Sequence, residues 1–595
     1  MKSHLIALSI GPVQDFIAAA RRTRDLWFGS HMLSEIAKAA ALAVHNAGGE
    51  LIFPHPGSRE KLSPETDFTV ANIILAETND PQTVRENAEK AARESWLSFA
   101  HEAREKAGDM VREEVWKEQL GDVVEFYSAW TPVSPERYKA ARERVMRLLA
   151  ARKNCRNFSP FTGKAGLPKS SLDGLRETVL KENARSRGPL RIKPGESLCA
   201  VGVTKRVSGE GRFPSVSRVA SDPWLRGLLT HQKGRESLEK MKQHCEKLVQ
   251  SGALSRISIK NGLFNEFPYE GTPLYIDRHN SVEKEAPAGS GVSEILQEIR
   301  KELESLLPSF GVPSPYFSVL CADGDRMGKA ISRATSPDEH RNLSSALSAF
   351  ASNARVIVEK NRGVCVYTGG DDVLAFLPCD TALSCARALH DDFGKNLEGV
   401  SKSVKEGDKP TLSVGISVGH ALEDLADLLD WGREAERRAK ADGKPAERDG
   451  LSVIVRSRGG ADQFVREQWG RLEGDGVLLP LDQRLLFWAE AYSRKALPSK
   501  FGYEVRSTAT FYKHWTDGLS CARALKMDLD RIFARKDVSL SEDERKIAEK
   551  SISAGITDAE DLERLADELI IGQWFSESIR QAKGGKPRAS DDNAA

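Results

Sequence analysis

The segment Val364–Leu377 constrains the fold of this chain more than any other stretch. Two short apolar runs flank Gly369-Gly370-Asp371-Asp372, and this pattern predicts a β-hairpin with two carboxylates at its tip. The glycines let the backbone turn with positive φ and let a bulky ligand approach closely. Adjacent carboxylates repel each other unless a cation lies between them, and Mg²⁺ prefers oxygen ligands and substrate phosphates. Taken alone, the hairpin could also be a solvated turn.

A second acidic strand end lies upstream of the hairpin. A β-rich run over residues 316–322 leads into Asp323, Gly324 and Asp325, and a helix expected over residues 337–360 connects it to the hairpin. Two acid-tipped strands joined by a helix can bring their carboxylates together. Such a cluster can hold two divalent ions over a triphosphate, where they would clamp the attacking and leaving oxygens. The sequence therefore predicts a site for two Mg²⁺ or Mn²⁺ ions, made of Asp323, Asp325, Asp371 and Asp372.

Composition limits the partners and the compartment. A chain of 595 residues has room for about three to five domains. Lys plus Arg (87) nearly equal Asp plus Glu (86), so the net charge provides no overall attraction to nucleic acid or membrane. The eight cysteines include no C-x-x-C pair, and we expect neither a signal peptide nor a membrane span. These features predict a cytoplasmic protein with reduced cysteines.

Residues 1–134 have the pattern of a ferredoxin-like unit. Apolar periodicity predicts four strands and two long helices. The strands are expected over residues 4–10, 50–53, 72–76 and 123–130, and the helices up to residue 46 and over residues 81–119. Their order is the βαββαβ arrangement.

Residues 311–460 repeat this plan and add the acid hairpin. The elements expected after the hairpin are a helix over 381–393, a strand over 411–419, a helix over 422–441 and a strand over 451–455 that closes the sheet. The first unit has no counterpart of the hairpin acids, so we expect it to lack catalytic metal ligands. The predicted fold class is α+β, with two ferredoxin-like, palm-like domains.

The rest of the chain is predicted to be mainly helical. In a central domain over residues 135–310, the helix Arg137–Arg156 is strongly basic and could meet RNA phosphates or be a solvated face, and residues 272–291 look like an exposed loop. Residues 461–581 form a C-terminal helical domain, and residues 582–595 a disordered tail. The aromatic residues expected in the core of the C-terminal helical domain are Trp469, Phe487, Trp488 and Trp515.

Seven stretches resemble a known family, and their order and spacing together are specific. They are Ser9–Ile17 with Trp27–Leu33, Leu198–Val201, Phe213–Ser215, Ala322–Gly328, Tyr367–Asp372 and Thr411–Ile416. Up to about residue 460 the chain resembles the large polymerase/cyclase-like subunit of type III CRISPR effector complexes, in the Cmr-module (type III-B) version.

The resemblance implies a nucleotidyl cyclase that is activated by target RNA. Two ATP molecules would bind between the palms, the 3′-hydroxyl of one would attack the α-phosphate of the other, and pyrophosphate would leave. The product in most of the family is cyclic oligoadenylate. Such phosphoryl transfer needs mainly positioning and charge neutralisation, which fits the absence of a candidate histidine base beside the hairpin.

The resemblance also assigns roles to individual residues. Asp371 and Asp372 match the catalytic acids, and Asp323 matches the metal ligand at the strand end. Lys440 looks like a lysine that related cyclases use near phosphates, although a solvated helix lysine is an equal alternative. The residues implied in nucleotide binding are Gly324, Gly369, Gly370 and Lys440, and in the first palm Ser9, Gly11 and Gln14.

Two departures from the family pattern matter. The first palm begins at about residue 3, so we expect no N-terminal HD nuclease domain and no DNA cleavage, and we interpret His390-Asp391 as a solvated helix face. Where relatives have two C-x-x-C pairs for zinc, this chain has Ser170, Asp173 and a single Cys199. Structural zinc needs a complete set of four ligands, so we predict that no zinc binds.

Alternatives remain for the product and for the activity. The same palm chemistry could join AMP to a different small-molecule acceptor. A stand-alone cyclic di-GMP synthase is disfavoured by the two palms and by the sequence Asp372-Val373. A catalytically silent scaffold is disfavoured by acids at two strand ends. The partners that the resemblance implies are guide RNA and target RNA, neighbouring Cmr-module subunits and a small helical subunit, with no membrane.

Overall fold

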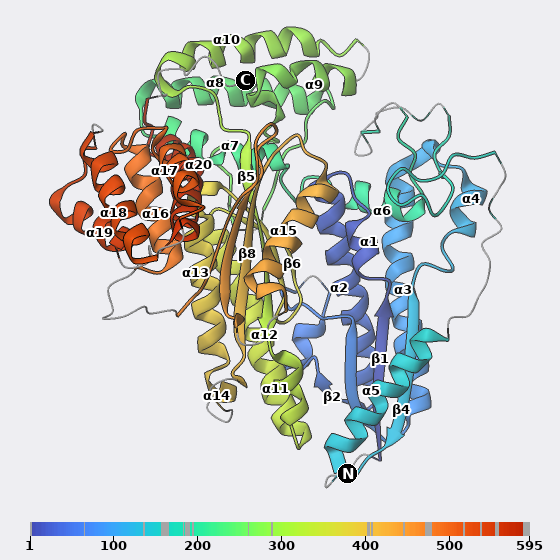
Figure 1. Ribbon diagram of the computed structural model, residues 1–595. Helices are drawn as coiled ribbons and strands as arrows, with labels where there is room; N and C mark the ends of the chain where they lie inside the picture. The colour runs from blue at the N-terminus through green and yellow to red at the C-terminus, as the bar shows by residue number, and fades with distance from the viewer. Residues whose placement is uncertain are drawn as a thin grey trace.

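An antiparallel four-stranded sheet, in the order β2-β3-β1-β4, forms the N-terminal part of this computed structural model (Figure 1). The central strand β1 sends alternate residues to opposite faces. Ile6 and Leu8 pack against α2 and α3, whereas Leu5 and Ala7 pack against α5. The elements are β1 His4–Gly11, α1 Gln14–Ala18, α2 Thr23–Asn46, β2 Glu50–Phe53, β3 Ile73–Thr78, α3 Pro81–Ala107, α4 Glu113–Glu118, β4 Glu125–Pro132 and α5 Tyr138–Asn154.

The structure describes residues 3–586 with short gaps. The gaps are 65, 135–136, 156–162, 164–165, 183, 185–190, 193–194, 260, 287–288, 402–404, 406–407, 444–446, 471–478, 516–517, 536–537 and 554–557. Most of the predicted tail lies outside the described residues, but Lys583–Lys586 are described, and the Gly585 N–H donates to the Arg580 carbonyl.

The predicted βαββαβ order of the first palm is confirmed, with one error. The helix expected to run to residue 119 ends at Ala107, because Gly108 adopts a positive φ of 58°. Glycine is the residue that most readily ends a helix in this way. The chain resumes a helix only at α4.

A second, six-stranded sheet has the order β10-β9-β8-β5-β7-β6. Its pairs are antiparallel apart from β8 and β9, which are joined through α15. The prediction that residues 451–455 close this sheet is wrong, because β10 pairs outside β9 and lies beyond the expected boundary at residue 460. The elements are β5 Tyr316–Asp325, α11 Met327–Arg333, α12 Pro337–Lys360, β6 Val364–Thr368, β7 Val373–Leu377, α13 Cys379–Asn396, α14 Glu398–Ser401, β8 Thr411–His420, α15 Leu425–Ala439, β9 Gly450–Val455 and β10 Gln463–Gln468.

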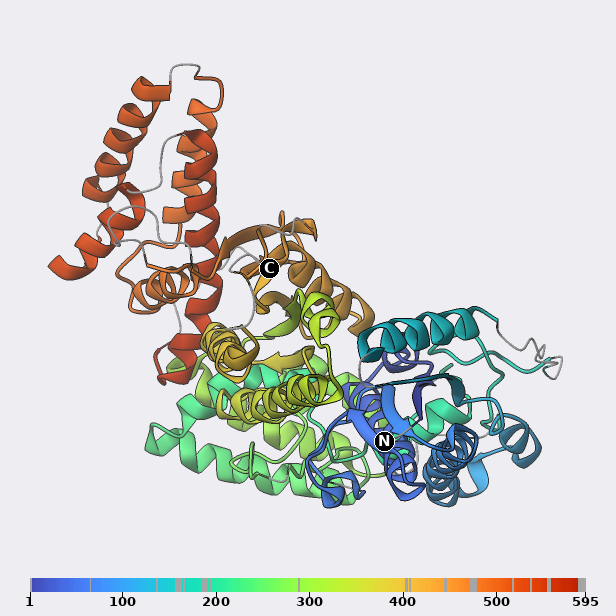
Figure 2. The ribbon, with the colours of Figure 1, turned by 90° about the horizontal axis from the view of Figure 1, so that it is seen from below.

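The remaining segments are helical and confirm the α+β class. The segment 272–291 is not simply a loop, since it contains α9, and Trp515 is not in the core, because its side chain is 49% exposed. The C-terminal helices project from the two sheets (Figure 2). The helices are α6 Ala200–Ser208, α7 Val216–Leu228, α8 Gln232–Gln250, α9 His279–Glu285, α10 Val292–Phe310, α16 Leu481–Ser493, α17 Phe501–Tyr512, α18 Gly518–Arg535, α19 Glu542–Ser553 and α20 Ala559–Ala582.

The two palms contact each other through α12, which packs against β2. His340 of α12 lies in this contact, where it stacks on Phe53 and its Nδ1 is 2.8 Å from the Tyr138 hydroxyl. Burial, together with the nearby Arg142 and Arg341, lowers the pKa of His340 to about 4. The imidazole therefore stays neutral in the folded protein.

Acidification is expected to weaken this palm contact. The unfolded chain takes up a proton on His340 near its ordinary pKa of about 6.5, and the folded chain only near about 4. Stability is therefore lost as the pH falls through this window, by on the order of 3 kcal/mol. Urea unfolding between pH 4 and 7 should show a flatter pH dependence for His340→Gln than for wild type, while His101→Gln, at an exposed position, should change nothing. An unchanged slope in His340→Gln would contradict this assignment.

Candidate metal and nucleotide site

The predicted hairpin is formed by β6 and β7, joined by residues 369–372. Gly370 has a φ of 85°, and the Gly369 N–H donates to the Asp372 carbonyl at 3.0 Å. A Cβ atom on Gly369 would overlap the ring of Tyr367. Both glycines are therefore needed, one for the turn and the other for the close packing of the tip.

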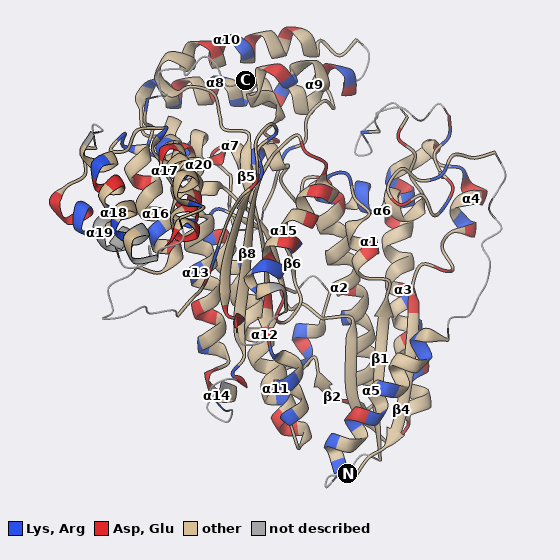
Figure 3. Ribbon diagram, viewed as in Figure 1, with Lys and Arg blue, Asp and Glu red and all other residues tan. Residues whose placement is uncertain are grey.

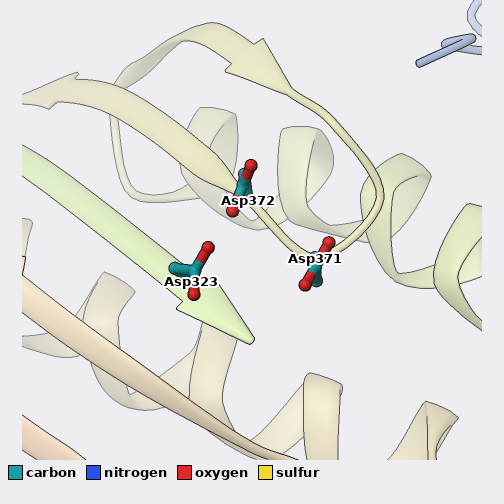
Figure 4. A group of neighbouring side chains, drawn as sticks. All are labelled: Asp323, Asp371 and Asp372. Carbon is teal, nitrogen blue, oxygen red and sulfur yellow. The ribbon is translucent and has the colours of Figure 1, made fainter. Parts of the chain in front are cut away.

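Three of the four predicted acids come together at this tip. Because Ala322 of β5 pairs with Val373 of β7, Asp323 lies directly beside the hairpin. Asp323, Asp371 and Asp372 each offer a carboxylate oxygen, and these oxygens lie within 4.8 Å of one another (Figure 4). A Cβ atom on Gly324 would lie 2.7 Å from the Asp371 Cβ, so the absence of a side chain there makes room for Asp371.

The electrostatics of the cluster favour a cation. Burial and the neighbouring Asp323 raise the pKa of Asp371 to about 6. Burial, a hydrogen bond with Asp323 and the two neighbouring charges raise the pKa of Asp372 still more. Three carboxylates that repel one another in a half-buried site are the donor set that a hard divalent ion such as Mg²⁺ or Mn²⁺ prefers. The residues present therefore fit the predicted metal.

Lys440 also lies at this cluster. α15 runs back along β8, where Gly415 lets the helix backbone approach closely, so the helix C-terminus returns to the acid end of the sheet. The Lys440 ammonium donates to Asp323 and lies 2.7 Å from Glu436. Burial alone would lower the pKa of Lys440, but these two acids raise it. Lys440 is thus not a solvated helix lysine, and its contact with a nucleotide remains a prediction.

Asp325 does not join the cluster, and its prediction as a metal ligand is not supported. The residue is fully buried. Its Oδ2 accepts hydrogen bonds from Thr411 Oγ1 (2.9 Å), Ser413 Oγ (2.7 Å) and the Asp449 N–H (3.0 Å). Burial raises the pKa of Asp325, although these hydrogen bonds act in the opposite direction. Asp325 therefore fastens β5 to β8 and to the segment before β9.

Removing this carboxylate should cost stability rather than metal affinity. Asp325→Ala removes the acceptor of the buried Ser413 hydroxyl and of the partly buried Thr411 hydroxyl and Asp449 N–H, and we expect a loss of about 1–3 kcal/mol in the free energy of unfolding. Urea unfolding measures this loss. Mn²⁺ binding at saturating metal, followed by electron paramagnetic resonance, should keep its stoichiometry; loss of a bound ion from a folded variant would restore Asp325 as a ligand.

The residues predicted to bind nucleotide in the first palm do not line the small cavity beside Tyr367. Ser9 is buried in β1, Gly11 ends that strand, and Gln14 is exposed at the start of α1. A small cavity between the palms is lined instead by other residues of α2 and of the segments flanking β1 and β3, which the sequence reasoning missed. Its polar members are Ser30, Ser34, Asn72 and Tyr367. Two of these residues had a sequence signal, because Ser30 falls within the family-like stretch Trp27–Leu33 and Tyr367 begins the stretch Tyr367–Asp372.

Two further predictions concern sites outside the palms' contact. Cys199 is buried at the start of α6, while Ser170 and Asp173 accept hydrogen bonds from nearby backbone N–H groups. The expectation that no zinc binds there stays a prediction. His390 is not part of a solvated face, because its Nε2 is 2.9 Å from Asp449 Oδ1 and its ring packs on Trp469.

Comparison with known families defines the class of protein. The family described as Cmr2, N-terminal, matches residues 5–101, and the family described as Cas10/Cmr2, second palm domain, matches residues 316–451. These matches cover most of the two sheets, and the second includes the acid cluster. In these two segments the chain matches the Cas10/Cmr2 family.

One curated relative is the CRISPR system Cmr subunit Cmr2 of Pyrococcus furiosus, 24% identical over 566 residues, with 78% of this chain and 63% of the relative covered. The chain thus spans about 63% of the length of that relative. Two solved structures share the fold at 14% identity: a type III-B Cmr-beta complex in its apo state (TM-score 0.58, covering 91% of this chain and 78% of the other) and one bound to cognate target RNA (0.60, 91% and 80%). In the described residues, we find no helix that is long and apolar enough to cross a membrane.

Proposed function

We propose that this chain is the metal-dependent nucleotidyltransferase of a type III-B CRISPR complex, and that it converts ATP into cyclic oligoadenylate when target RNA binds. The observation that carries the proposal is the convergence of Asp323, Asp371 and Asp372 at one end of the second palm sheet. The family match of that same segment supports it.

The proposed reaction assigns metal-binding and nucleotide-binding roles to residues of both palms. Asp323, Asp371 and Asp372 would hold the two divalent ions, which lower the pKa of an attacking hydroxyl and stabilise departing pyrophosphate. The glycines of the hairpin leave room for a triphosphate. Lys440 would balance charge at Asp323. Ser30 and Ser34 of the first palm, which line the small cavity beside Tyr367, would contact a second nucleotide.

RNA and neighbouring Cmr subunits are the proposed partners. Exposed positions of α5 carry Lys139, Arg144 and Arg147 beside a single acid, Glu143, and in the described part of the chain none of these three cations forms an ion pair. Blue segments mark the basic residues along this helix in Figure 3. On α3, by contrast, the surface cations are paired with acids, as in the pair Arg85–Glu89. An unmatched basic face suits RNA phosphates, and it favours the RNA-contact interpretation of this helix over a solvated face.

The proposal is tested by pyrophosphate release. The chain assembled with its partner subunits and guide RNA should release pyrophosphate from ATP only when target RNA and Mg²⁺ or Mn²⁺ are present. EDTA should stop the reaction, and added Mn²⁺ should restore it. If ATP reacts only when a cell extract supplies another acceptor, the transferase assignment stands and the cyclase assignment falls. If no pyrophosphate is released under any of these conditions, the chain is a scaffold.

A further inference from the structure

A second cavity, of about 840 Å³, lies at the other end of the second sheet from the acid cluster. Its wall includes His420, which pairs with Tyr316, whereas Asp323 pairs with Ser413. Seven residues of β8 separate these positions, which corresponds to about 23 Å. The cavity is therefore distinct from the metal site. α2, α7, α9, the end of α10 and the start of α15 enclose it, at the top of the molecule in Figure 1.

Arginines dominate the polar part of the wall. Arg21, Arg22 and Arg24 come from the start of α2, and Arg191 comes from the segment before α6. Arg24 and Arg191 are each only 4% exposed. The Nε atom of Arg191 is buried and makes no hydrogen bond with the described residues, although its Nη1 lies 3.4 Å from Glu270. Arg191 lines the cavity, and its only acid contact among the described residues is this long one, so its guanidinium has donors left for an anionic oxygen.

Two helices point their N-termini at the same space. α2 has 24 residues and α15 has 15, and neither has a side-chain cap at its N-terminus. The cap residue of α2, Arg22, and the first residues of α15, Asp424 and Leu425, line the cavity. Uncapped backbone N–H groups and the positive end of the helix dipole both favour a bound anion.

The acids on the wall do not cancel this charge. Glu285 lies 3.4 Å from Arg22, a long distance for a charged pair, and Glu270 is equally far from Arg191. Burial, and next the charge of Arg22, lower the pKa of Arg24 to about 10, while Asp25 and Glu270 act in the opposite direction. The other acids on the wall are Asp277, Asp424 and Glu423, of which Glu423 pairs with Arg458 at 2.8 Å.

Another part of the wall is apolar and aromatic, with Phe213, Trp224, Tyr275 and the ring of His420, and Ser215, Ser217 and Thr272 also line the cavity. The volume of the cavity is within the range of small-molecule sites. We propose that this cavity binds a phosphorylated nucleotide, with the phosphates against the arginines and the base against the aromatic side. The nucleotide could be free or could be the terminal nucleotide of an RNA, because both present the same chemistry. The proposal does not depend on the acid cluster.

Isothermal titration of the full chain with ATP in EDTA tests the proposal. Binding should persist in the Asp371→Ala/Asp372→Ala variant and weaken at least about tenfold in Arg191→Gln, where the buried anion contact is lost. Arg22→Gln should weaken ATP binding similarly. Because the Arg22 side chain is partly exposed, this second variant tests the cavity even if Arg191→Gln does not fold. Arg93→Gln on α3, at an arginine whose side chain is 43% exposed, is the matched control and should bind as wild type.

Two competitors identify the source of the ligand. Competition by inorganic phosphate supports the anion subsite. Competition by a 5′-phosphorylated oligoribonucleotide that is stronger than by AMP assigns the cavity to an RNA end, and the reverse order assigns it to a free nucleotide. The proposal is overturned if ATP does not bind without metal, or if Arg191→Gln and Arg22→Gln both bind ATP as wild type does. If the acid cluster had no catalytic activity, these binding results would be unchanged. Failure of the proposed nucleotidyltransferase activity can therefore be distinguished from failure of the proposed nucleotide binding in this cavity.

Discussion

Replacing Asp371 and Asp372 by alanine is expected to reduce pyrophosphate release from ATP by about 10³-fold or more, because charge neutralisation is the main source of catalysis in phosphoryl transfer. The same change should leave the fold intact. Burial and mutual repulsion raise the pKa values of both carboxyl groups in the metal-free protein, so their removal relieves an unfavourable interaction. The melting temperature in EDTA should therefore be equal to that of wild type or higher.

The control for this experiment is Asp338→Ala, at an acid of α12 whose side chain is 85% exposed. This variant should release pyrophosphate at the wild-type rate. A gain in metal-free stability together with a loss of activity would identify the two aspartates as functional rather than structural residues. Full activity in the double variant would remove the acid cluster from the mechanism.

Gly324→Ala is expected to lower activity by about 10²-fold, since a displacement of about 1 Å in a catalytic site can have an effect of this size. The backbone at Gly324 does not have a positive φ, so alanine causes no backbone strain there. The new Cβ would lie 2.7 Å from the Asp371 Cβ, 2.8 Å from the Met327 Cγ and 2.9 Å from Asp371 Oδ2. Asp371 has to move, and Mn²⁺ affinity should fall together with activity.

Gly328→Ala provides a matched comparison four residues further along the chain. A Cβ atom there meets nothing within 4 Å, and alanine favours the helix α11. This variant should keep its activity and its Mn²⁺ affinity. If Gly324→Ala behaves in the same way as Gly328→Ala, Asp371 does not need the position that the structure gives it.

Local sequence patterns were enough to predict the palms and most of the acid cluster. Alternating apolar residues identify β5, β6 and β7, and the glycines of the hairpin place Asp371 and Asp372 at its tip. The role of Asp325 could not be predicted in this way. Asp323 and Asp325 are two residues apart on one strand, and only the positions of β7 and β8 decide that one faces the hairpin and the other the hydroxyl groups of β8.

Other features depend on contacts between distant segments. β10 carries Arg466, Glu467 and Gln468, and such a polar edge strand lacks the alternation that marks a buried one. Trp515 is exposed even though tryptophan is usually well buried. The arginine-lined cavity is built from segments between residues 21 and 458, which no short motif connects. His340 becomes a neutral contact residue only because α12 packs against the first palm.

The most direct test of the central claim is the identity of the product. The assembled complex would be incubated with ATP, Mg²⁺ and matching target RNA, beside a complex that carries Asp371→Ala and Asp372→Ala, and the products would be analysed by mass spectrometry. The account predicts cyclic oligoadenylate from the wild type alone, and only when target RNA is present. Intact ATP in both samples, or the same product from both, would contradict it.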